Sequence, residues 1–148
     1  MPRVLLTGMS GTGKSTLAAE LVHRGHRAVE TDDEGWHRAD GSWHVGRMTA
    51  LLHAHPDLLV VGTADNQGQF YDRFAAVVLL SAPAEVVLAR VGTRGTNPYG
   101  RTEEQRAEIL GYLATVEPLL RRGATLELDG RRPTTELADV VERLLIGG

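Results

Sequence analysis

The sequence contains no cysteine in its 148 residues. A disulfide-bonded scaffold, a cysteine nucleophile and a thiolate metal site are therefore excluded, and the composition fits a reducing compartment, so we expect a cytoplasmic protein. No apolar stretch reaches the roughly 18 residues that a membrane span requires, and we expect no membrane partner. The first residues, MPRVLLTG, lack the length and the small-residue cleavage site of a signal peptide.

An excess of positive charge is also lacking. The formal net charge is -3 at pH 7, which gives no overall positive field for a nucleic-acid backbone, so we expect no nucleic-acid partner. The six histidines show no metal-ligand spacing on a clear helix, and a zinc site is not expected. A chain of this length with 42% hydrophobic residues is the size of one globular domain, and we expect a single domain over residues 1–148, as a monomer or homodimer.

Lysine is nearly absent: Lys14 is the only one, and the other fifteen basic residues are arginines. It lies in LLTGMSGTGKST, where Gly8, Gly13, Lys14 and Ser15 satisfy the pattern G-x-x-x-x-G-K-[ST] of a phosphate-binding loop. Glycines there allow consecutive backbone N–H groups to turn toward a phosphate, and the helix that follows adds its positive dipole end. A lysine places a compact charge against the β- and γ-phosphates, where a planar guanidinium would not fit in the same way. The Ser15 hydroxyl is a hard oxygen ligand suited to Mg²⁺.

Short apolar runs alternate with helical patterns along the chain. This alternation is typical of a parallel sheet covered by helices on both faces, and it predicts a three-layer α/β/α domain. The predicted strands are residues 3–7, 27–31, 58–62, 76–81 and 125–129. The predicted helices are residues 14–23, 84–91, 134–145 and a long helix that follows a capping box at Thr102 and Gln105 and includes Leu120. The segment 33–55 is predicted as a loop followed by a helix.

A run of acidic residues follows the second predicted strand, in ETDDEGW. Glu30, Asp32, Asp33 and Glu34 therefore belong at the carboxyl edge of the sheet, where ligands bind in open α/β sheets. A carboxylate there can accept the proton of an acceptor hydroxyl or hold Mg²⁺ through water. The alternative is a solvated acidic turn that caps a helix.

The segment after the third predicted strand, VVGTADNQGQFYD, has the D-x-x-G-Q spacing of a GTPase switch at Asp65, Gly68 and Gln69. A base-reading N-K-x-D would then be needed after the fourth strand, but the sequence there is LLSAPAEV and the chain has no second lysine. The sequence therefore disfavours a GTPase switch. Asp65 and Gln67 are instead expected either to bind an acceptor or to cap a short helix.

Arginines flank a glycine-containing stretch in LARVGTRGTNPYGRTEEQR. Phosphoryl transfer requires positive groups such as the guanidiniums of Arg90, Arg94 and Arg101, because negative charge spreads over the transferring oxygens. A loop that carries such groups can also exclude water when it closes. We predict a lid over residues 92–102, with Arg90 and Arg94 acting on the transferring group. The alternative is an ordinary surface loop whose arginines serve solubility.

The chain resembles the small P-loop kinases of the nucleoside monophosphate kinase and shikimate kinase type, within the P-loop NTPase superfamily, because its features follow the same order along the sequence. The shared features are the phosphate loop, the acids after the second strand, a glycine after the third, LSAPAEVVLAR at the fourth, an arginine-bearing lid, and a fifth strand with a last helix. The resemblance implies a five-stranded parallel sheet. It also implies an ATP-dependent kinase that uses Mg²⁺ and transfers the γ-phosphoryl group to a hydroxyl or phosphate acceptor, which is a small molecule.

The resemblance also assigns roles to individual residues. It implies catalytic roles for Lys14, Asp32, Arg90 and Arg94, and Mg²⁺ ligation by Ser15 and Asp32. The residues expected to bind ATP are Gly8, Ser10, Gly11, Thr12, Gly13, Lys14, Ser15 and Thr16 at the phosphates, with Arg132 and Pro133 at the adenine. The residues expected to contact the acceptor are Asp32, Asp33, Trp36, Gly62 and Asp65, with the acceptor-binding segment at residues 33–57.

Two features depart from that family. Members often have D-x-D after the second strand, whereas Glu30-Thr31-Asp32 stands here, which leaves open whether Glu30 or Asp32 supports the metal. The segment between the second and third strands has no evident arginine pair for a nucleotide phosphate. Its aromatic rings either stack on a flat acceptor or pack the segment onto the domain. The alternative function is a regulatory nucleotide-binding protein, or an NTPase without a small-molecule acceptor.

Overall fold

A five-stranded, wholly parallel sheet forms the centre of the computed structural model, which describes residues 3–33, 35–93 and 102–147. The strands are β1 (Arg3–Thr7), β2 (Ala28–Glu30), β3 (Leu58–Val61), β4 (Ala76–Ser81) and β5 (Leu126–Asp129). Their order in the sheet is β2-β3-β1-β4-β5, and each neighbouring pair is parallel. The predicted fold class is confirmed, and every predicted strand is present within one residue at either end.

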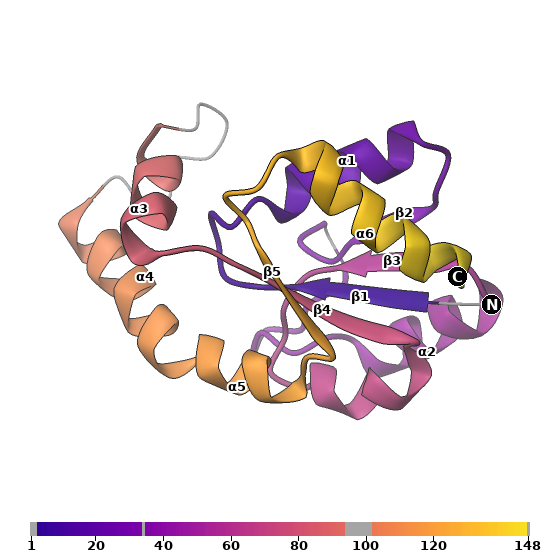
Figure 1. The fold of residues 1–148 in the computed structure, drawn as a ribbon. Helices are drawn as coiled ribbons and strands as arrows, with labels where there is room; N and C mark the ends of the chain where they lie inside the picture. Colours follow the sequence, from indigo (N-terminus) through magenta and orange to yellow (C-terminus); the bar gives the residue numbers. More distant parts are fainter. Residues whose placement is uncertain (1–2, 34, 94–101, 148) are drawn as a thin grey trace.

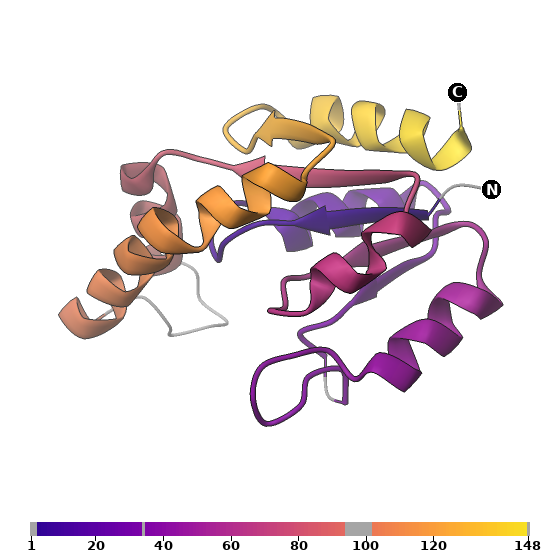
Figure 2. The ribbon, with the colours of Figure 1, turned by 90° about the horizontal axis from the view of Figure 1, so that it is seen from below.

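Helices cover both faces of the sheet, as Figures 1 and 2 show. One face carries α1 (Lys14–His23) and α6 (Thr134–Ile146). The other carries α2 (Val45–Ala54), the 3₁₀-helix η1 (Gln67–Arg73) and α5 (Glu117–Gly123). Helices α3 (Ala84–Thr93) and α4 (Glu103–Thr115) pack on each other through Val87, Val91 and Ile109, beyond the carboxyl ends of the strands (Figure 1).

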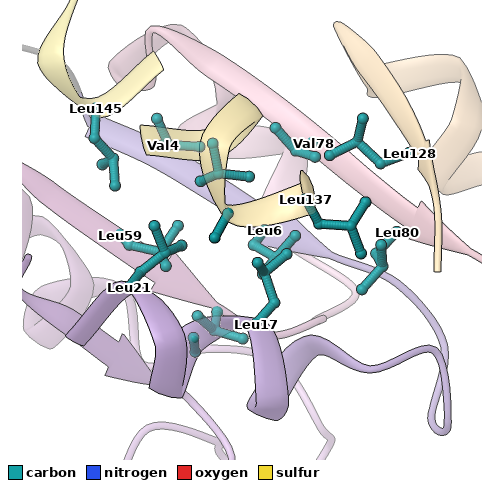
Figure 3. Packing of buried hydrophobic residues seen from close by; sticks show 14 of the residues in the cluster. Val4, Leu6, Leu17, Leu21, Leu59, Val78, Leu80, Leu128, Leu137 and Leu145 are labelled. Carbon is teal, nitrogen blue, oxygen red and sulfur yellow. The ribbon is translucent and has the colours of Figure 1, made fainter. Parts of the chain in front are cut away.

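Successive side chains of β1 point to opposite faces of the sheet and so contact the helices on both faces. Val4 and Leu6 point into the cluster beneath α1 and α6, which Figure 3 shows, and Leu5 points into the opposite cluster. All three side chains are fully buried. A strand that is buried on both faces has a continuous apolar sequence. Burial of each leucine of β1 contributes about 2 kcal/mol to the free energy of unfolding. The loops at the strand ends are thereby held on a rigid support.

The segment between β2 and β3 packs on the face that carries α2. Trp36 and Trp43 belong to the same buried cluster as Met48 of α2 and Phe70 of η1. Asn66 fixes the segment further, because its side chain accepts a hydrogen bond from the Trp43 N–H at 2.8 Å and donates one to the Trp43 carbonyl at 3.0 Å. Of the two roles left open for these aromatic rings, the structure shows packing onto the domain.

The long helix predicted after the capping box is two helices, and this prediction is corrected. Helix α4 ends at Thr115, and α5 begins at Glu117 with Pro118 in its first turn. Proline has no N–H and restricts the residue before it, so a continuous hydrogen-bond ladder cannot pass this point. The capping box itself is confirmed, with Thr102 Oγ1 accepting from the Gln105 N–H at 3.1 Å. No helix in the described ranges is long and apolar enough to cross a membrane.

Candidate functional site

A cleft of about 700 Å³ lies at the carboxyl ends of β1, β2 and β3. The chain leads from β1 to β2 at one edge of the sheet, and from β4 to β5 at the other edge. Open α/β sheets bind ligands where neighbouring strands have connections that diverge in this way. Helix α3 contributes one arginine to the wall. The lining residues are Gly8, Met9, Ser10, Gly11, Gly13, Lys14, Ser15, Thr16, Asp32, Gly62, Thr63 and Arg90.

The glycines of the phosphate loop have conformations that side chains rarely adopt. The φ angles of Gly8, Gly11 and Gly13 are 154°, 84° and 105°. A Cβ on Gly11 would lie 2.9 Å from Val91 Cγ1, and one on Gly8 would overlap the carbonyl oxygen of Leu80. Both glycines are therefore required for the loop to pass between β1 and α1, and the loop forms a cradle that fits phosphate groups.

The ammonium of Lys14 lies against the loop that precedes it. Nζ donates hydrogen bonds to the carbonyl oxygens of Gly8, at 2.7 Å, and Met9, at 2.9 Å. A compact group with three N–H donors can make both of these bonds. A guanidinium is planar and wider, so the same short reach would not satisfy both carbonyls.

The hydroxyl of Ser15 and the carboxylate of Glu30 form the second feature of the cleft. Ser15 Oγ donates to Glu30 Oε1 at 2.7 Å. Both are hard oxygen ligands of the kind Mg²⁺ selects, so the residues present fit that ion. Glu30, not Asp32, is the carboxylate in contact with Ser15. In the described ranges no three His, Asp or Glu side chains gather in a way that could hold a metal on their own.

Asp32, Gly62 and Thr63 form the wall at the ends of β2 and β3. Asp32 is exposed in the cleft. Gly62 has φ of 153°, and a Cβ there would overlap Oγ1 of Thr31, which is fully buried. Gly62 lines the same cleft as the phosphate loop, and Thr31 supplies a packing reason for glycine at this position. Thr63 was not predicted, although its place directly after Gly62 at the carboxyl edge was a usable signal.

Arg90 holds two loops together. It lies in α3, not in the predicted lid, and it donates to the carbonyl oxygens of Thr12, at 3.0 Å, and Gly130, at 2.7 Å. Gly130 follows β5 and approaches the phosphate loop so closely that a Cβ would overlap the Thr12 carbonyl oxygen. The arginine therefore fastens the turn after β5 to the phosphate loop while it lines the cleft. Arg94 and most of the predicted lid lie outside the described residues.

Several predicted contact residues do not line this cleft. Asp33 and Trp36 border a separate hollow beside α1 and β2, and the Trp36 ring is covered by the Arg47 guanidinium, 4.0 Å from its centroid. Asp65 is exposed after β3. Arg132 and Pro133 are exposed in the turn after β5. Their contacts with an acceptor or an adenine remain predictions.

The GTPase-like spacing after β3 has no counterpart in the cleft. Asp65, Gly68 and Gln69 are exposed, and none of the three is among the residues that line the cleft. Gln67 is instead the buried member of this segment, and it lies in η1. Its amide donates to the Tyr71 hydroxyl at 2.8 Å and its Oε1 accepts from the Ala64 N–H at 2.9 Å.

Charged residues beside the cleft form a network at the ends of β4 and β5. Arg121 donates to Glu127 at 2.8 Å, and Ser81 donates to the same carboxylate at 2.7 Å. These hydrogen bonds, that of Arg121 first, hold the pKa of Glu127 below its usual range. The Arg131 guanidinium contacts both carboxylate oxygens of Asp129 and lowers its pKa to about 2. Both carboxylates are therefore ionised at neutral pH.

A phosphate loop between the first strand and first helix of a parallel sheet defines the P-loop class of α/β proteins. A family model described as an AAA domain matches residues 4–111, and the chain belongs to this family.

Curated relatives match shorter stretches. HPr kinase/phosphorylase of Leptospira biflexa is 43% identical over 58 residues, which are 39% of this chain and 18% of that protein. The protein of the same name from Lactiplantibacillus plantarum is 39% identical over 67 residues, 45% of this chain and 21% of that one. The chain thus spans about a fifth of the length of these relatives.

Solved structures match over nearly the whole chain. Shikimate kinase from Acinetobacter baumannii, in complex with shikimate, has a TM-score of 0.69 at 20% identity and covers 99% of this chain and 94% of its own. A gluconokinase from Sinorhizobium meliloti 1021 has a TM-score of 0.58 at 17% identity, with 98% and 91% covered. Deoxyadenosine kinase from M. mycoides, with bound dATP, has a TM-score of 0.63 at 14% identity, and the match covers 99% of this chain and 100% of that one. The predicted resemblance to small P-loop kinases is confirmed at the level of the fold.

Proposed function

We propose that the protein is an ATP-dependent kinase that transfers the γ-phosphoryl group to the hydroxyl of an acceptor. The observation that carries this proposal is the shared cleft, which is lined both by the phosphate loop with Lys14 and by an exposed carboxylate, Asp32, from the segment after β2. Phosphoryl transfer needs charge compensation on the donor side and a proton acceptor on the other side. One cleft supplies both.

Each residue of the cleft has a task in this reaction. The backbone N–H groups of the loop and the Lys14 ammonium bind the β- and γ-phosphates and stabilise charge that develops on them. Asp32 orients the acceptor hydroxyl and receives its proton. Ser15 and Glu30 would hold Mg²⁺, which when bound neutralises phosphate charge. Arg90 keeps the loop in place, because it is fixed to the Thr12 carbonyl.

A hydroxyl acceptor is favoured over a phosphate acceptor by the groups on the β2 and β3 side of the cleft. This side presents the exposed carboxylate of Asp32 beside Gly62 and Thr63. A carboxylate attracts the proton of an alcohol and repels an incoming phosphate. The solved structures of similar fold include a kinase in complex with shikimate, a compound that carries hydroxyl groups. The name of the curated relatives adds HPr as an acceptor to test.

The proposal is tested by ADP release from Mg·ATP in the presence of single acceptors. The panel holds nucleosides, nucleoside monophosphates, sugars, shikimate-like polyols and purified HPr, and Lys14→Ala is the blank. We expect release that depends on one hydroxyl acceptor, and we expect Asp32→Asn to lower this rate by about 100-fold or more. Asp72→Asn is the matched control, because Asp72 is an exposed aspartate on η1 away from the cleft. Stimulation only by nucleoside monophosphates would overturn the preference for a hydroxyl.

A regulatory nucleotide-binding protein or an acceptor-independent NTPase is the alternative. Slow ADP release that no acceptor changes, but that Lys14→Ala abolishes, would support this alternative. Full transfer by Lys14→Ala would contradict both functions, because both require the phosphate loop.

A further inference from the structure

We infer that Thr63 is a positioning residue of the phosphate loop, held by a chain of buried side-chain hydrogen bonds through Thr7 and Gln67. We name these three residues the hydroxyl relay. The inference rests on the proposed nucleotide binding and adds to it a group outside the phosphate-loop motif. The relay sets the orientation of the Gly8 carbonyl, and through it the position of the Lys14 ammonium.

The relay is a continuous series of hydrogen bonds from Gln67 in η1 to the phosphate loop. Gln67 Nε2 lies 3.3 Å from Thr7 Oγ1, and Thr7 Oγ1 lies 2.9 Å from Thr63 Oγ1. Thr63 Oγ1 donates to the Gly8 carbonyl at 2.9 Å. When Gln67 donates to Thr7 and Thr7 donates to Thr63, every hydroxyl in the relay is both donor and acceptor. Chains of this kind polarise their members and strengthen each bond.

Burial makes the relay expensive to break. Thr7 is fully buried, Gln67 is 3% exposed, and Thr63 is half-buried where it reaches the cleft. The far end is fixed as well, because the Gln67 amide holds the Tyr71 hydroxyl and the Ala64 N–H. A buried polar group that loses its partner costs about 1–3 kcal/mol, so the hydroxyls keep this one arrangement.

The relay and Lys14 meet on one oxygen. The Gly8 carbonyl accepts from Lys14 Nζ at 2.7 Å and from Thr63 Oγ1 at 2.9 Å, which uses both of its lone pairs. Gly8 has no Cβ and a φ of 154°, so its own side chain gives the peptide no restraint. Thr63 supplies that restraint from outside the loop. Without it the carbonyl can turn, and the ammonium loses a fixed support next to the phosphates.

The first test is the affinity for Mg·ATP, measured by calorimetry on variants of Thr63. Thr63→Val keeps the shape and removes the hydroxyl, and we expect it to weaken binding about 10-fold. Thr63→Ser keeps the hydroxyl, and we expect affinity within about 3-fold of the unsubstituted protein. Thr125→Val is the matched control, because the Thr125 hydroxyl bonds to the Val77 backbone, away from the cleft. We expect no change in its affinity.

A double-mutant cycle tests the chain itself. Gln67→Met removes the donor to Thr7, and we expect it to weaken Mg·ATP binding about 3-fold in the unsubstituted protein but not in Thr63→Val, because its effect passes through Thr63. Melting temperatures are measured alongside. A purely structural role would lower the melting temperature of Thr63→Val and leave the affinity of the folded protein unchanged.

The outcomes separate the relay from the proposed function. If the unsubstituted protein does not bind Mg·ATP, the proposed function and the relay both fall. If it binds and Thr63→Val binds equally well, only the relay is overturned. Additive effects of Gln67→Met and Thr63→Val would leave Thr63 as a positioning residue but contradict its connection to Gln67.

Discussion

Lysine and arginine have different tasks in this cleft, which both residues line. Lys14 reaches two carbonyls of its own loop, six and five residues before it. Arg90 reaches two carbonyls on different loops, 78 and 40 residues away in the sequence. A compact ammonium suits the narrow cradle, and a rigid fork of donors suits the bridge between separate backbones. This difference explains why a chain rich in arginine has one lysine at this position.

Lys14→Arg tests that division at the residue level. The variant keeps the charge, but the guanidinium is too wide for the two carbonyl contacts, so we expect acceptor phosphorylation to fall by about 100-fold or more. Steady-state ADP release measures the loss. The melting temperature should change little, since Lys14 is only half-buried. Near-normal turnover would show that positive charge alone is sufficient.

Gly62→Ala tests the packing reason for glycine at the end of β3. The Cβ would overlap Thr31 Oγ1 and the φ of 153° would be strained, so we expect a loss of about 2–4 kcal/mol in the free energy of unfolding. Denaturant titration measures it.

Gly68→Ala is the matched control for that substitution, because a Cβ there would meet nothing within 4 Å and should cost little. Combining Gly62→Ala with Thr31→Ala removes the overlap but not the φ strain, and should recover part of the loss. Equal stability of the two glycine variants would contradict the argument.

At the level of elements, the sequence predicted every strand because each is a short apolar run that ends at a turn. It predicted α1 from its apolar periodicity, and it also predicted helices at the positions of α3 and α6. The break between α4 and α5 was missed, although Pro118 was visible, because apolar residues kept a helical spacing across it. Helix η1 was only one of two expectations for its segment, since a 3₁₀ turn has no apolar period of its own to read.

Strand β5 and helix α5 are joined by an ion network whose strength depends on pH. The pKa of Glu127 is lowered by Arg121 and Ser81 in the folded protein from an ordinary value of 4.5. A depressed carboxyl pKa stabilises the fold above the unfolded value, and this contribution is lost as the pH falls through the folded value. The pair is more than a third exposed, so solvent weakens it.

Glu127→Gln tests this contribution. We expect a melting temperature lower by about 1–4 °C at pH 7, with the difference from the unsubstituted protein shrinking as the pH falls below 4.5. Scanning calorimetry from pH 7 down to about pH 3 measures both proteins, so that the scan passes well below the ordinary pKa of 4.5. Asp72→Asn, an exposed change outside the network, should show no such trend. A difference that stays constant with pH would mean that Glu127 acts through packing.

For the molecule as a whole, the sequence predicted the position of the cleft but only part of its wall. The phosphate loop is a local pattern, and Asp32 and Gly62 follow strands, so strand order alone brings them together. Thr63 and the relay depend on which side chains meet across 56 to 60 residues of sequence. The bridge from Arg90 to Gly130 also depends on the register of β4 and β5, which no local pattern records.

The cleft is lined by the loops that follow β1, β2 and β3 and by one side chain of α3. Because a ligand there contacts several elements of the fold, it should stabilise the entire domain. A ligand at 100 times its Kd that binds only the folded state adds about 2.7 kcal/mol to the free energy of unfolding. For a chain of this size that is a rise of about 5–10 °C in the melting temperature. We expect this rise with Mg·ATP, and a smaller one with ATP plus a chelator, because Ser15 and Glu30 would then lack their cation. Scanning fluorimetry measures each shift. Lys14→Ala should show none, and an equal shift in that variant would mean that the nucleotide binds elsewhere.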